Sequence, residues 1–398
     1  MIQKPDELLK DGVPINRIID CIKGNDEGPT LIFFAGIHGN EPAGVIGLQK
    51  VFKELREQAF SVKGSIYGLA GNLNALQKQI RYEDEDLNRI WNTTKLDKIK
   101  SYKKLKLRQE EKEMLDLHEV LLKLLNTENP PFYFIDLHTT SGETTPFIVM
   151  NDSLLNRRFV LNYPLPKVLG IEEYLHGALL SFINEMGYVS FGFESGQHEQ
   201  YEAITNNVNF IHYTLMLTSS ITVSKSWESV VKRAMDTISV ISTDFFEITY
   251  EHHLKATDSF QMAPGFLNFQ RIKKGIKIAD FNGEPVIANK AAQIFMPLYQ
   301  SQGSEGFYLI KPIPMIFLWI SKYFRKLRLD NVLTILPGLN WKSNERKELV
   351  VNTRIAKYIS KSFFHLMGYR VRRGEDSYLI LKNRESASRH SEYPSSWK

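Results

Sequence analysis

Four side chains of the kinds that bind metal ions or transfer protons stand at the ends of apolar runs in this sequence. His38 and Glu41 lie in the glycine-rich stretch "GIHGNEPAG", directly after the run "TLIFFA". His138 closes the run "FYFIDLH", and Glu194 follows an apolar run in "FGFESG". Two imidazoles and a carboxylate with a fourth position left for water are the ligand set of hydrolytic zinc sites.

A zinc ion in such a site would lower the pKa of its water toward ~7 and polarise a carbonyl group, so that a nearby carboxylate can act as general base and then general acid. Glu194 suits that proton-transfer role. Asp136, in "IDLH", either supports the imidazole of His138 or caps its own loop. A lone histidine is more often hydrogen-bonded or solvent-facing than a ligand, so the repeated context of strand, turn and ligand favours the metal site.

These side chains can meet only if the strands that precede them lie in one sheet. In open α/β sheets, ligands bind beyond the carboxyl ends of the strands, which is where each of these residues stands. The alternation of short apolar runs with longer periodic segments predicts an α/β domain. The predicted strands are 30–36, 64–71, 132–138 and 188–196, and the predicted helices are 42–59, 106–126, 172–186 and 200–219.

The chain of 398 residues is too long for one small core. Changes along the chain in the pattern of apolar, Gly and Pro residues predict three parts. Residues 1–224 are expected to form the α/β catalytic domain. Residues 225–312 are expected to form a small β domain, because 244–312 holds short β-type runs punctuated by Gly and Pro. Residues 313–398 are expected to form a basic α+β C-terminal extension, with a helix at 345–367 and a hairpin turning at "RGED".

Composition limits the chemistry and the location of the protein. Hydrophobic residues make up 43% and charged residues 24% of the chain, as in globular proteins. Cys21 is the only cysteine, so a metal site would need histidine and carboxylate ligands. The first residues lack the features of a signal peptide, which predicts a cytoplasmic protein. The longest apolar stretch, "PIPMIFLWI", is shorter than the ~20 residues that span a bilayer, so no transmembrane segment is expected.

The positive net charge belongs to the C-terminal extension. Residues 313–398 contain 17 Lys and Arg against 7 Asp and Glu, whereas the preceding residues contain 33 against 38. Nucleic-acid binding by the main body is therefore not expected. The predicted helix at 345–367 carries an apolar stripe with a basic face beside it, which would either pack on the protein, the interpretation we favour, or rest on an anionic membrane or an acidic partner. The stripe consists of Val351, Ile355, Ile359, Phe363 and Leu366.

Three motifs, "GIHGNEPAG", "RYEDEDLNR" and "DLHTT", occur in the order found in the succinylglutamate desuccinylase/aspartoacylase family, and together they resemble that branch of the zinc-carboxypeptidase-like hydrolases. The resemblance implies one Zn²⁺ per chain, bound by His38, Glu41 and His138, with Glu194 as the catalytic acid and base. It also implies a carboxypeptidase-like mixed sheet flanked by helices, followed by a small β domain. It extends to about residue 312 and does not cover the C-terminal extension.

The middle motif supplies the basic residues of the site. By resemblance, Arg81 stabilises the oxyanion that develops on the substrate, and Asn88 and Arg89 hold a substrate carboxylate. A guanidinium can bind a carboxylate through two parallel hydrogen bonds and keeps its charge. The acidic residues 83–86 are expected to form a solvated face of the loop that points away from both arginines.

The sequence departs from the aspartoacylase pattern before Glu194. Where aspartoacylase-like members carry a Tyr and an Arg that bind a second substrate carboxylate, this chain has Leu180 and Asn184. An N-acyl aspartate is therefore not the favoured substrate over other N-acyl amino acids, esters or small amides. Tyr299 is a loose match to a tyrosine that the β domain lends to the pocket, and His198 is expected at the surface.

The sequence thus predicts a zinc-dependent deacylase that hydrolyses the amide, or the ester, bond of a small N-acylated amino acid or related compound. A metallocarboxypeptidase that acts on short peptides is the nearest alternative; the β domain, which in the family restricts the entrance, argues against it. A non-catalytic scaffold that binds partners through its basic tail is a third possibility, and the complete set of four site residues argues against it. The acyl group, the amino acid and the oligomeric state are left open.

Overall fold

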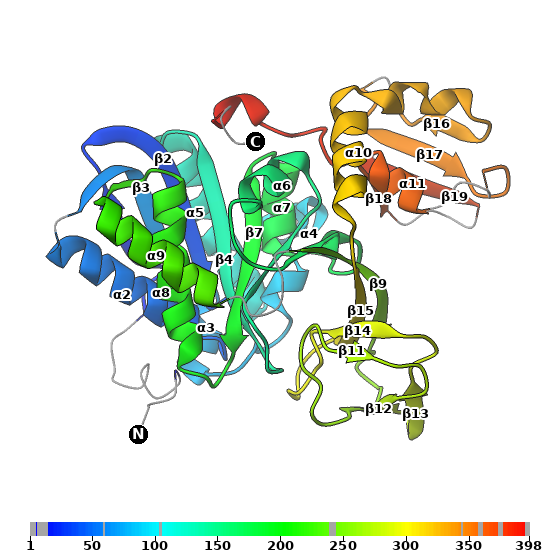
Figure 1. The fold of residues 1–398 in the computed structure, drawn as a ribbon, viewed down its shortest axis with the longest axis horizontal. Coiled ribbons are helices and arrows are strands. Elements are labelled where there is room, and N and C mark those ends of the chain that lie inside the picture. The colour runs from blue at the N-terminus through cyan, green and yellow to red at the C-terminus, as the bar shows by residue number, and fades with distance from the viewer. Residues whose placement is uncertain are drawn as a thin grey trace.

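The computed structural model describes Pro5 and residues 15–58, 60–102, 106–238, 244–343, 345–356, 361–372 and 377–394. Figure 1 shows an α/β part (residues 15–238), a β part (residues 244–312) and a C-terminal unit (residues 313–394) that lies beside both. The fold is therefore the expected one: a mixed α/β domain, then small β structure, then an α+β extension.

Twelve strands of the described residues form one mixed sheet that runs through the α/β part into the β part. They are β1 (Ile18–Lys23), β2 (Asp26–Ala35), β3 (Ser61–Ala70), β4 (Phe132–Thr140), β5 (Phe147–Met150), β6 (Lys167–Leu169), β7 (Val189–Gln197), β8 (Ile221–Thr222), β9 (Phe245–His253), β11 (Arg271–Ile272), β14 (Ala292–Phe295) and β15 (Glu305–Pro312). Their order is β1-β3-β2-β4-β7-β5-β6-β9-β15-β14-β11, with β8 paired to β3. Because β3, β2, β4 and β7 are mutually parallel, their carboxyl ends meet at one edge.

Helices cover both faces of this sheet (Figure 1). They are α2 (Ala43–Glu57), α3 (Leu73–Lys78), α4 (Thr93–Lys100), α5 (Gln109–Thr127), α6 (Leu154–Val160), α7 (Leu179–Glu185), α8 (Glu202–Leu217) and α9 (Lys225–Ile238), with 3-10 turns η1 (Leu87–Arg89) and η3 (Ile171–Glu173). In β2, Leu31 and Phe33 pack in one core with α2 and α8, and Ile32 and Phe34 pack in another with α5 and α7. A strand buried on both faces needs apolar residues at every position, which explains the unbroken run "TLIFFA".

The four strands and three of the four helices predicted in the α/β part are confirmed, with shifts of a few residues at their ends. The exception is the helix expected at 172–186, which the structure divides into η3 and α7. Gly177 lies between them with a left-handed φ of +74°, and its carbonyl accepts a hydrogen bond from the backbone N–H of Trp91. A left-handed residue ends a helix, so the continuous helix was a wrong prediction.

The β part continues the main sheet, because β9 pairs in parallel with β6 and antiparallel with β15. A separate three-stranded sheet contains β10 (Phe260–Met262), β12 (Lys277–Phe281) and β13 (Glu284–Ile287). Helix α9, which lies just past the expected first domain boundary, packs on the main core through Val231 and Met235. The domain boundaries at 224/225 and 312/313 remain predictions.

The C-terminal unit folds around its own small sheet of order β16-β17-β19-β18. Its elements are α10 (Met315–Lys326), η4 (Leu329–Ile335), β16 (Leu339–Trp341), β17 (Glu348–Asn352), α11 (Lys361–Leu366), β18 (Tyr369–Arg372), β19 (Tyr378–Asn383) and η5 (His390–Glu392). None of the helices of the described residues is long and apolar enough to cross a membrane.

The helix predicted at 345–367 is wrong, because this segment begins as strand β17 and becomes helical only at α11. In β17, Leu349 and Val351 are buried and alternate with more exposed neighbours, the period of a strand. Val350 and Val351 pair with β16 on one side and with β19 on the other. Ile359 of the expected stripe lies outside the described residues. The expected hairpin is confirmed as the antiparallel pair β18–β19, and its "RGED" turn lies outside the described residues.

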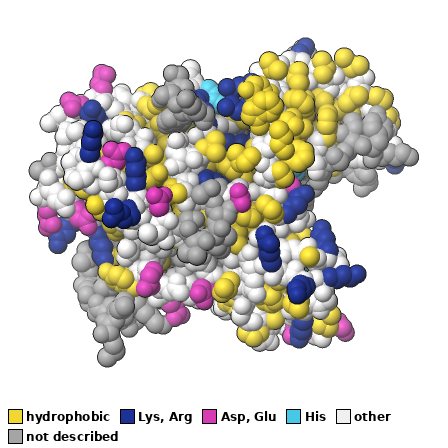
Figure 2. Space-filling view, viewed as in Figure 1, with side chains coloured by type: hydrophobic (Ala, Val, Ile, Leu, Met, Phe, Trp, Pro, Cys, Tyr) yellow, Lys and Arg dark blue, Asp and Glu magenta, His cyan; other side chains and the backbone are white. Residues whose placement is uncertain are grey.

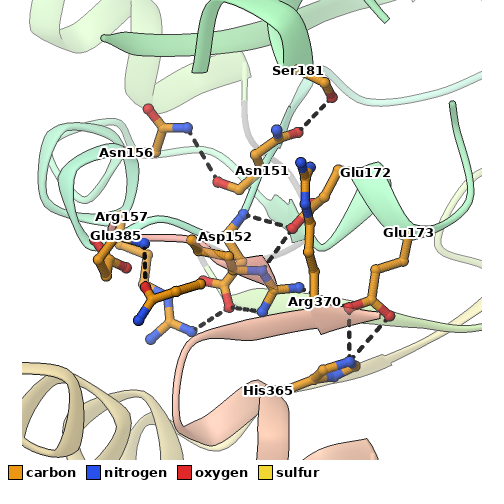
Figure 3. A network of polar contacts seen from close by, with 12 residues as sticks. Asn151, Asp152, Asn156, Arg157, Glu172, Glu173, Ser181, His365, Arg370 and Glu385 are labelled. Atoms are coloured by element: carbon orange, nitrogen blue, oxygen red, sulfur yellow. Dashed lines mark hydrogen bonds and ion pairs between the residues drawn. The ribbon is translucent and has the colours of Figure 1, made fainter. Parts of the chain in front are cut away.

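A buried cluster of ion pairs holds the C-terminal unit against the α/β part (Figure 3). Asp152 Oδ2 lies 2.8 Å from Arg325 Nη2 and 2.9 Å from Arg384 Nη1. Arg384 also pairs with Glu172 at 2.8 Å and Glu173 at 3.0 Å. We call this cluster the Asp152 network; its members are Asp152, Arg157, Glu172, Glu173, Arg325, His365, Arg384 and Glu385.

The last described segment returns to the main sheet, as the red end of the ribbon in Figure 1 shows. Tyr393 is buried in the main core, where its hydroxyl donates to the carbonyl of Phe132 and accepts a hydrogen bond from the N–H of Val189 at 2.9 Å. The C-terminal unit is thus fixed to the α/β part at two separate places, through charge at Asp152 and through an aromatic ring at Tyr393.

Candidate active site

The glycine-rich turn "GIHGNE" connects β2 to α2 and carries the first two candidate ligands. Gly39 lies against α3: a Cβ atom on it would come within 2.0 Å of the carbonyl carbon of Ala75. Helix α2 begins after Pro42, which needs no partner for a backbone N–H. The close packing at Gly39 and the early start of α2 hold His38 and Glu41 in a short, fixed turn at the carboxyl edge of the sheet.

The sheet register brings the other two residues to the same edge. His138 of β4 and Glu194 of β7 are direct partners in the parallel ladder, so their side chains project from the same face. The rings of His38 and His138 lie 5.3 Å apart, centroid to centroid. One potential ligand atom from each of His38, Glu41 and His138 lies within 4.8 Å of the others, and all three side chains are buried. The structure therefore brings the expected ligand set together.

Glu41 stands between the two imidazoles. Its Oε1 lies 2.8 Å from His38 Nδ1, and its Oε2 lies 3.0 Å from His138 Nδ1 and accepts the N–H of Thr139 at 3.0 Å. Burial alone would raise the pKa of Glu41, but the charges of His38 and His138 outweigh burial and hold it well below its usual value. Glu41 is therefore a carboxylate at neutral pH.

The outer nitrogen of each imidazole faces a second carboxylate. His138 Nε2 lies 2.7 Å from Asp136, and His38 Nε2 lies 3.0 Å from Asp86. Carboxylates in this position orient metal-binding histidines and raise their basicity. Asp136 thus takes the supporting position considered from the sequence. The expectation that residues 83–86 all face solvent is wrong for Asp86, which has a strongly lowered pKa because the charges of His38 and Arg81 overcome its burial.

The loop that carries Asp86 is shaped by a buried acid that sequence reasoning missed. Glu110 of α5 is fully buried, and its carboxylate accepts the backbone N–H groups of Glu83 at 2.8 Å and Asp84 at 3.0 Å. These bonds fix the backbone of the acidic stretch, so that Asp86 and Arg81 turn inward together. Arg81 Nη2 then donates to Asp86 Oδ2 at 3.0 Å, and its Nη1 lies 3.6 Å from Glu41.

The donor set fits a divalent cation. Glu41, Asp86, Asp136 and Glu194 surround the two imidazoles, with Arg81 as the nearby cation. Burial lowers the pKa of His138, yet the charges of Asp136 and Glu41 outweigh burial and raise it well above its usual value. A pocket that stabilises positive charge this strongly, with imidazole and carboxylate donors, matches the ligand preference of zinc.

Glu194 differs from the ligands in its environment. It is 4% exposed, and its Oε2 has no hydrogen-bond partner among the described residues. Burial, reinforced by the negative charges of Glu41 and Asp136, raises its pKa to about 8. An acid that exchanges its proton near neutral pH, with a free oxygen in a cavity, has the properties of a general acid and base.

These residues line one cavity of about 120 Å³ at the junction of the α/β and β parts. Its walls include Arg81, Asn88, Leu180, Met296 and Tyr308. His198 also lines it, 2.7 Å from Thr139 Oγ1 and 3.2 Å from Gln300 Oε1, so the expectation of a surface position was wrong. Its place is set by β7, which continues three residues past Glu194 and keeps the following turn at the cavity.

The two residues expected to hold a substrate carboxylate are already engaged. Arg89 donates through Nε and Nη2 to the carboxylate of Glu305 in β15, at 3.2 and 3.0 Å. Asn88 accepts the backbone N–H of Leu179 with its side-chain oxygen at 2.9 Å. Both residues line the cavity, as expected. Glu305, 216 positions away from Arg89, could not be assigned to the site from the sequence.

The tyrosine that the β part lends to the cavity is Tyr308. Its buried hydroxyl has no hydrogen-bond partner among the described residues. Tyr299 instead donates to the carbonyl of Ala263 at 2.8 Å and accepts the N–H of Phe266 at 2.9 Å, which fixes a loop of the β part. Leu180 lies in the cavity wall, and Asn184 donates to the carbonyl of Tyr188, so neither position offers a cation to a substrate.

Comparison with known proteins agrees with this arrangement. Residues 27–204 match the family model described as the succinylglutamate desuccinylase/aspartoacylase catalytic domain. A succinylglutamate desuccinylase of Pseudomonas aeruginosa is 32% identical over 92 residues, which span 22% of this chain and 28% of that protein. A probable aspartoacylase of Acaryochloris marina is 30% identical over 169 residues, which span 42% of this chain and 54% of that protein.

Solved structures share the fold at low sequence identity. A succinylglutamate desuccinylase from Vibrio parahaemolyticus matches with a TM-score of 0.54 at 12% identity, covering 79% of this chain and 96% of that one. The product-bound ectoine utilization protein from Ruegeria pomeroyi matches with a TM-score of 0.52 at 17% identity, covering 74% of this chain and 88% of that one. The chain therefore has the mixed-sheet α/β fold of these solved structures. Residues 27–204, less than half of the chain, are therefore similar to the catalytic domain of the succinylglutamate desuccinylase/aspartoacylase family, and the matched segments span 28% and 54% of the two curated relatives.

Proposed function

We propose that this protein is a zinc-dependent deacylase that hydrolyses the amide, or ester, bond of a small N-acylated amino acid or related compound. The observation that carries the proposal is the convergence of His38, Glu41 and His138, with Glu194 beside them in the same cavity. Similar proteins bear the names succinylglutamate desuccinylase and probable aspartoacylase, which supports amide hydrolysis.

His38, Glu41 and His138 would hold one Zn²⁺, which when bound supplies Lewis-acid polarisation of a carbonyl group and a more acidic water. Glu194 takes the proton of the attacking water and later returns it to the leaving amine or alcohol, which its raised pKa permits in both directions near neutral pH. Arg81 donates hydrogen bonds to the carbonyl oxygen as negative charge develops there. Asp136 and Asp86 keep the imidazoles oriented.

The size of the cavity favours a small substrate. Its volume of about 120 Å³ is small beside the ~300–1,000 Å³ of common ligand pockets. The β part closes one wall with Met296, Leu298 and Tyr308. A peptide chain would have to displace this wall, whereas an acyl group and one amino-acid side chain need far less room. This geometry favours the deacylase over the metallocarboxypeptidase.

The charges around the cavity favour a substrate with no more than one carboxylate. Arg89 shares its charge with Glu305, and the positions of Leu180 and Asn184 carry no cation. A second substrate carboxylate would therefore meet Glu305 without a free guanidinium to balance it. Among N-acyl amino acids, we expect monocarboxylates to be hydrolysed faster than dicarboxylates.

The test is a turnover screen of purified protein over N-acetyl and N-succinyl amino acids and dipeptides, combined with elemental analysis. Zinc at one equivalent and release of free amino acid from the acylated compounds are expected. Glu194→Gln should retain the metal and lose about 10²–10⁴-fold in kcat, whereas Glu202→Gln, an exposed residue of α8, should change neither. Zinc-loaded protein that cleaves dipeptides faster than acyl amino acids would instead establish the peptidase, and no turnover on any compound would favour the scaffold.

A further inference from the structure

Helix α10 presents an apolar face to solvent, and Figure 2 shows hydrophobic side chains gathered over this helix and its neighbours. Ile316, Trp319, Tyr323 and Leu327 recur at helical spacing and are 56%, 56%, 45% and 67% exposed. We call these four residues the α10 face. Single exposed apolar residues are common on proteins, but a contiguous row of large ones marks a binding surface.

The opposite side of the same helix carries both polar and apolar residues. Leu318, Ser321 and Arg325 are buried; Ser321 donates to the carbonyl of Leu366, and Arg325 donates to Asp152 and to the carbonyl of His365. Leu318 packs in the main core and Phe324 packs against the core of the C-terminal unit, so α10 has its packing contacts without the α10 face. Because the Asp152 network already fixes α10 through Arg325, the outward apolar side has no role in holding this helix.

Basic residues border the α10 face on one side. Lys322 and Lys326 are one helical turn apart, and neither ammonium has an ion-pair partner among the described residues. With Arg158 and Arg328, they line a groove of about 570 Å³ whose apolar walls include Trp319. Figure 2 shows Lys and Arg side chains next to this hydrophobic region. Residues 306–329 contain no Asp or Glu, and the carboxylate that lines the groove, Glu385, pairs with Arg325, so the surface is apolar in the middle and positive along its edge.

We propose that the α10 face docks on a bilayer that contains anionic lipids, with the basic groove against the headgroups. Aromatic and aliphatic residues beside lysines are the composition of helices that lie in the membrane interface. The rings of Trp319 and Tyr323 contact each other at 4.5 Å, centroid to centroid, and form a rigid aromatic pair at the centre of the face. The helix lies on the membrane and does not cross it.

Charge decides between a bilayer and a second copy of this chain. A second copy docked through the same face would offer these lysines no carboxylate from residues 306–329, so burying them there would leave their charges uncompensated. An anionic bilayer offers the opposite charge to the same groups and an apolar layer for the side chains of the α10 face. None of the residues of this face or its groove lines the catalytic cavity, so docking and turnover can be measured separately.

The experiment is co-sedimentation of the full-length protein with phosphatidylcholine vesicles, with and without phosphatidylserine. Binding is expected only with phosphatidylserine, and it should weaken at high salt. Each lysine near such a surface contributes about fivefold in partitioning, so Lys322→Glu with Lys326→Glu should weaken binding by at least about 25-fold. The matched control is Lys273→Glu with Lys274→Glu, two exposed lysines of the β part, which should bind as the unchanged protein does.

A second variant tests the apolar contribution. Ile316→Ser with Leu327→Ser should also abolish sedimentation with vesicles, while the circular dichroism spectrum and melting temperature stay those of the unchanged protein, because both side chains are exposed. No binding to phosphatidylserine vesicles, or equal loss in the Lys273/Lys274 control, would overturn the proposal. So would a stable dimer in analytical ultracentrifugation that the serine variant dissociates, since that result would assign the face to a second copy.

Discussion

The catalytic cluster and the Asp152 network are both buried and charged, and both join segments far apart in the sequence, but they differ in how their carboxylates are paired. In the network, Asp152, Glu172, Glu173 and Glu385 face Arg157, Arg325, Arg384 and His365 (Figure 3). In the cluster, Glu41, Asp86, Asp136 and Glu194 share Arg81 and two histidines. Every carboxylate of the network forms an ion pair with an arginine, whereas Glu194 of the cluster has no ion-pair partner among the described residues and has a raised pKa. A buried acid in this state beside imidazole and carboxylate ligands indicates a cation and a reaction.

Metal removal should produce the largest difference between the two regions. Dialysis against a chelator is expected to lower turnover by about 10³-fold or more, because several kcal/mol of transition-state stabilisation is lost. Added Zn²⁺ should restore it. The Asp152 network contains no part of the metal site, so near-ultraviolet circular dichroism should show the C-terminal unit still packed in the metal-free protein. Full turnover in protein shown by elemental analysis to lack metal would contradict the assignment of the cluster.

Asp152→Ala should produce the complementary result, a loss of stability with the metal site intact. The substitution leaves three guanidinium groups without their shared carboxylate, which is expected to lower the free energy of unfolding by about 3–5 kcal/mol. Denaturant titration measures this loss, and zinc content should not change. Glu228→Ala, which breaks an exposed pair on α9, is the control and should change stability by no more than about 0.5 kcal/mol. Equal effects of the two substitutions would show that the network is not structural.

Glu305→Gln tests whether the ion pair between Arg89 and Glu305 in the catalytic cavity sets the preference for monocarboxylate over dicarboxylate substrates. Removing the negative charge beside Arg89 frees a guanidinium for a second substrate carboxylate. We expect the ratio of kcat/KM for N-acetylaspartate to kcat/KM for N-acetylalanine to rise about tenfold. This change corresponds to the free energy of one charge-assisted hydrogen bond. Glu284→Gln, at an exposed position of β13, should leave the ratio unchanged. A fall in the ratio would mean that Glu305 helps to bind the dicarboxylate.

The smallest expected effect is a pH-dependent change in stability that arises from ion pairs at the edge of the C-terminal unit. Glu185 of α7 contacts Arg370 and lies 2.9 Å from Lys382. Burial would raise its pKa, but these two cations lower it to about 2. Because the folded-state pKa lies below that of the unfolded chain, about 4.3, the contribution to stability is complete above pH 4.3 and is lost as the pH falls toward 2.

The expected loss can be measured from unfolding free energies of the unchanged protein and Glu185→Gln at pH 6 and pH 3. The two proteins should differ more at pH 6 than at pH 3, and by less than Asp152→Ala changes stability, since Glu185 is partly exposed. A difference that does not depend on pH would show that the pairs with Arg370 and Lys382 do not stabilise the fold.

Much of the α/β part could be predicted because its signals are local. The unbroken apolar run before His38 and the proline at position 42 predict a buried strand and a helix start from a few neighbouring residues. The helix expected at 345–367 failed because an apolar stripe at helical spacing in a short segment also fits alternating burial in a strand. Pairing of β17 with β16 and β19, which no local pattern records, decided the outcome.

The kinds of groups in the site and the strands that carry them follow from the amino-acid sequence, because residue type and local periodicity are properties of short segments. The tertiary structure alone decided which charges meet. It brought Asp86 into contact with His38, Glu305 with Arg89 and Arg384 with Asp152. These pairs are separated by 48, 216 and 232 positions in the sequence. Contacts across such separations depend on sheet order and on the packing of whole elements. Composition and local spacing therefore do not predict them. The outward side of α10 was settled in the same way, by a buried arginine that fixed the rotation of the helix.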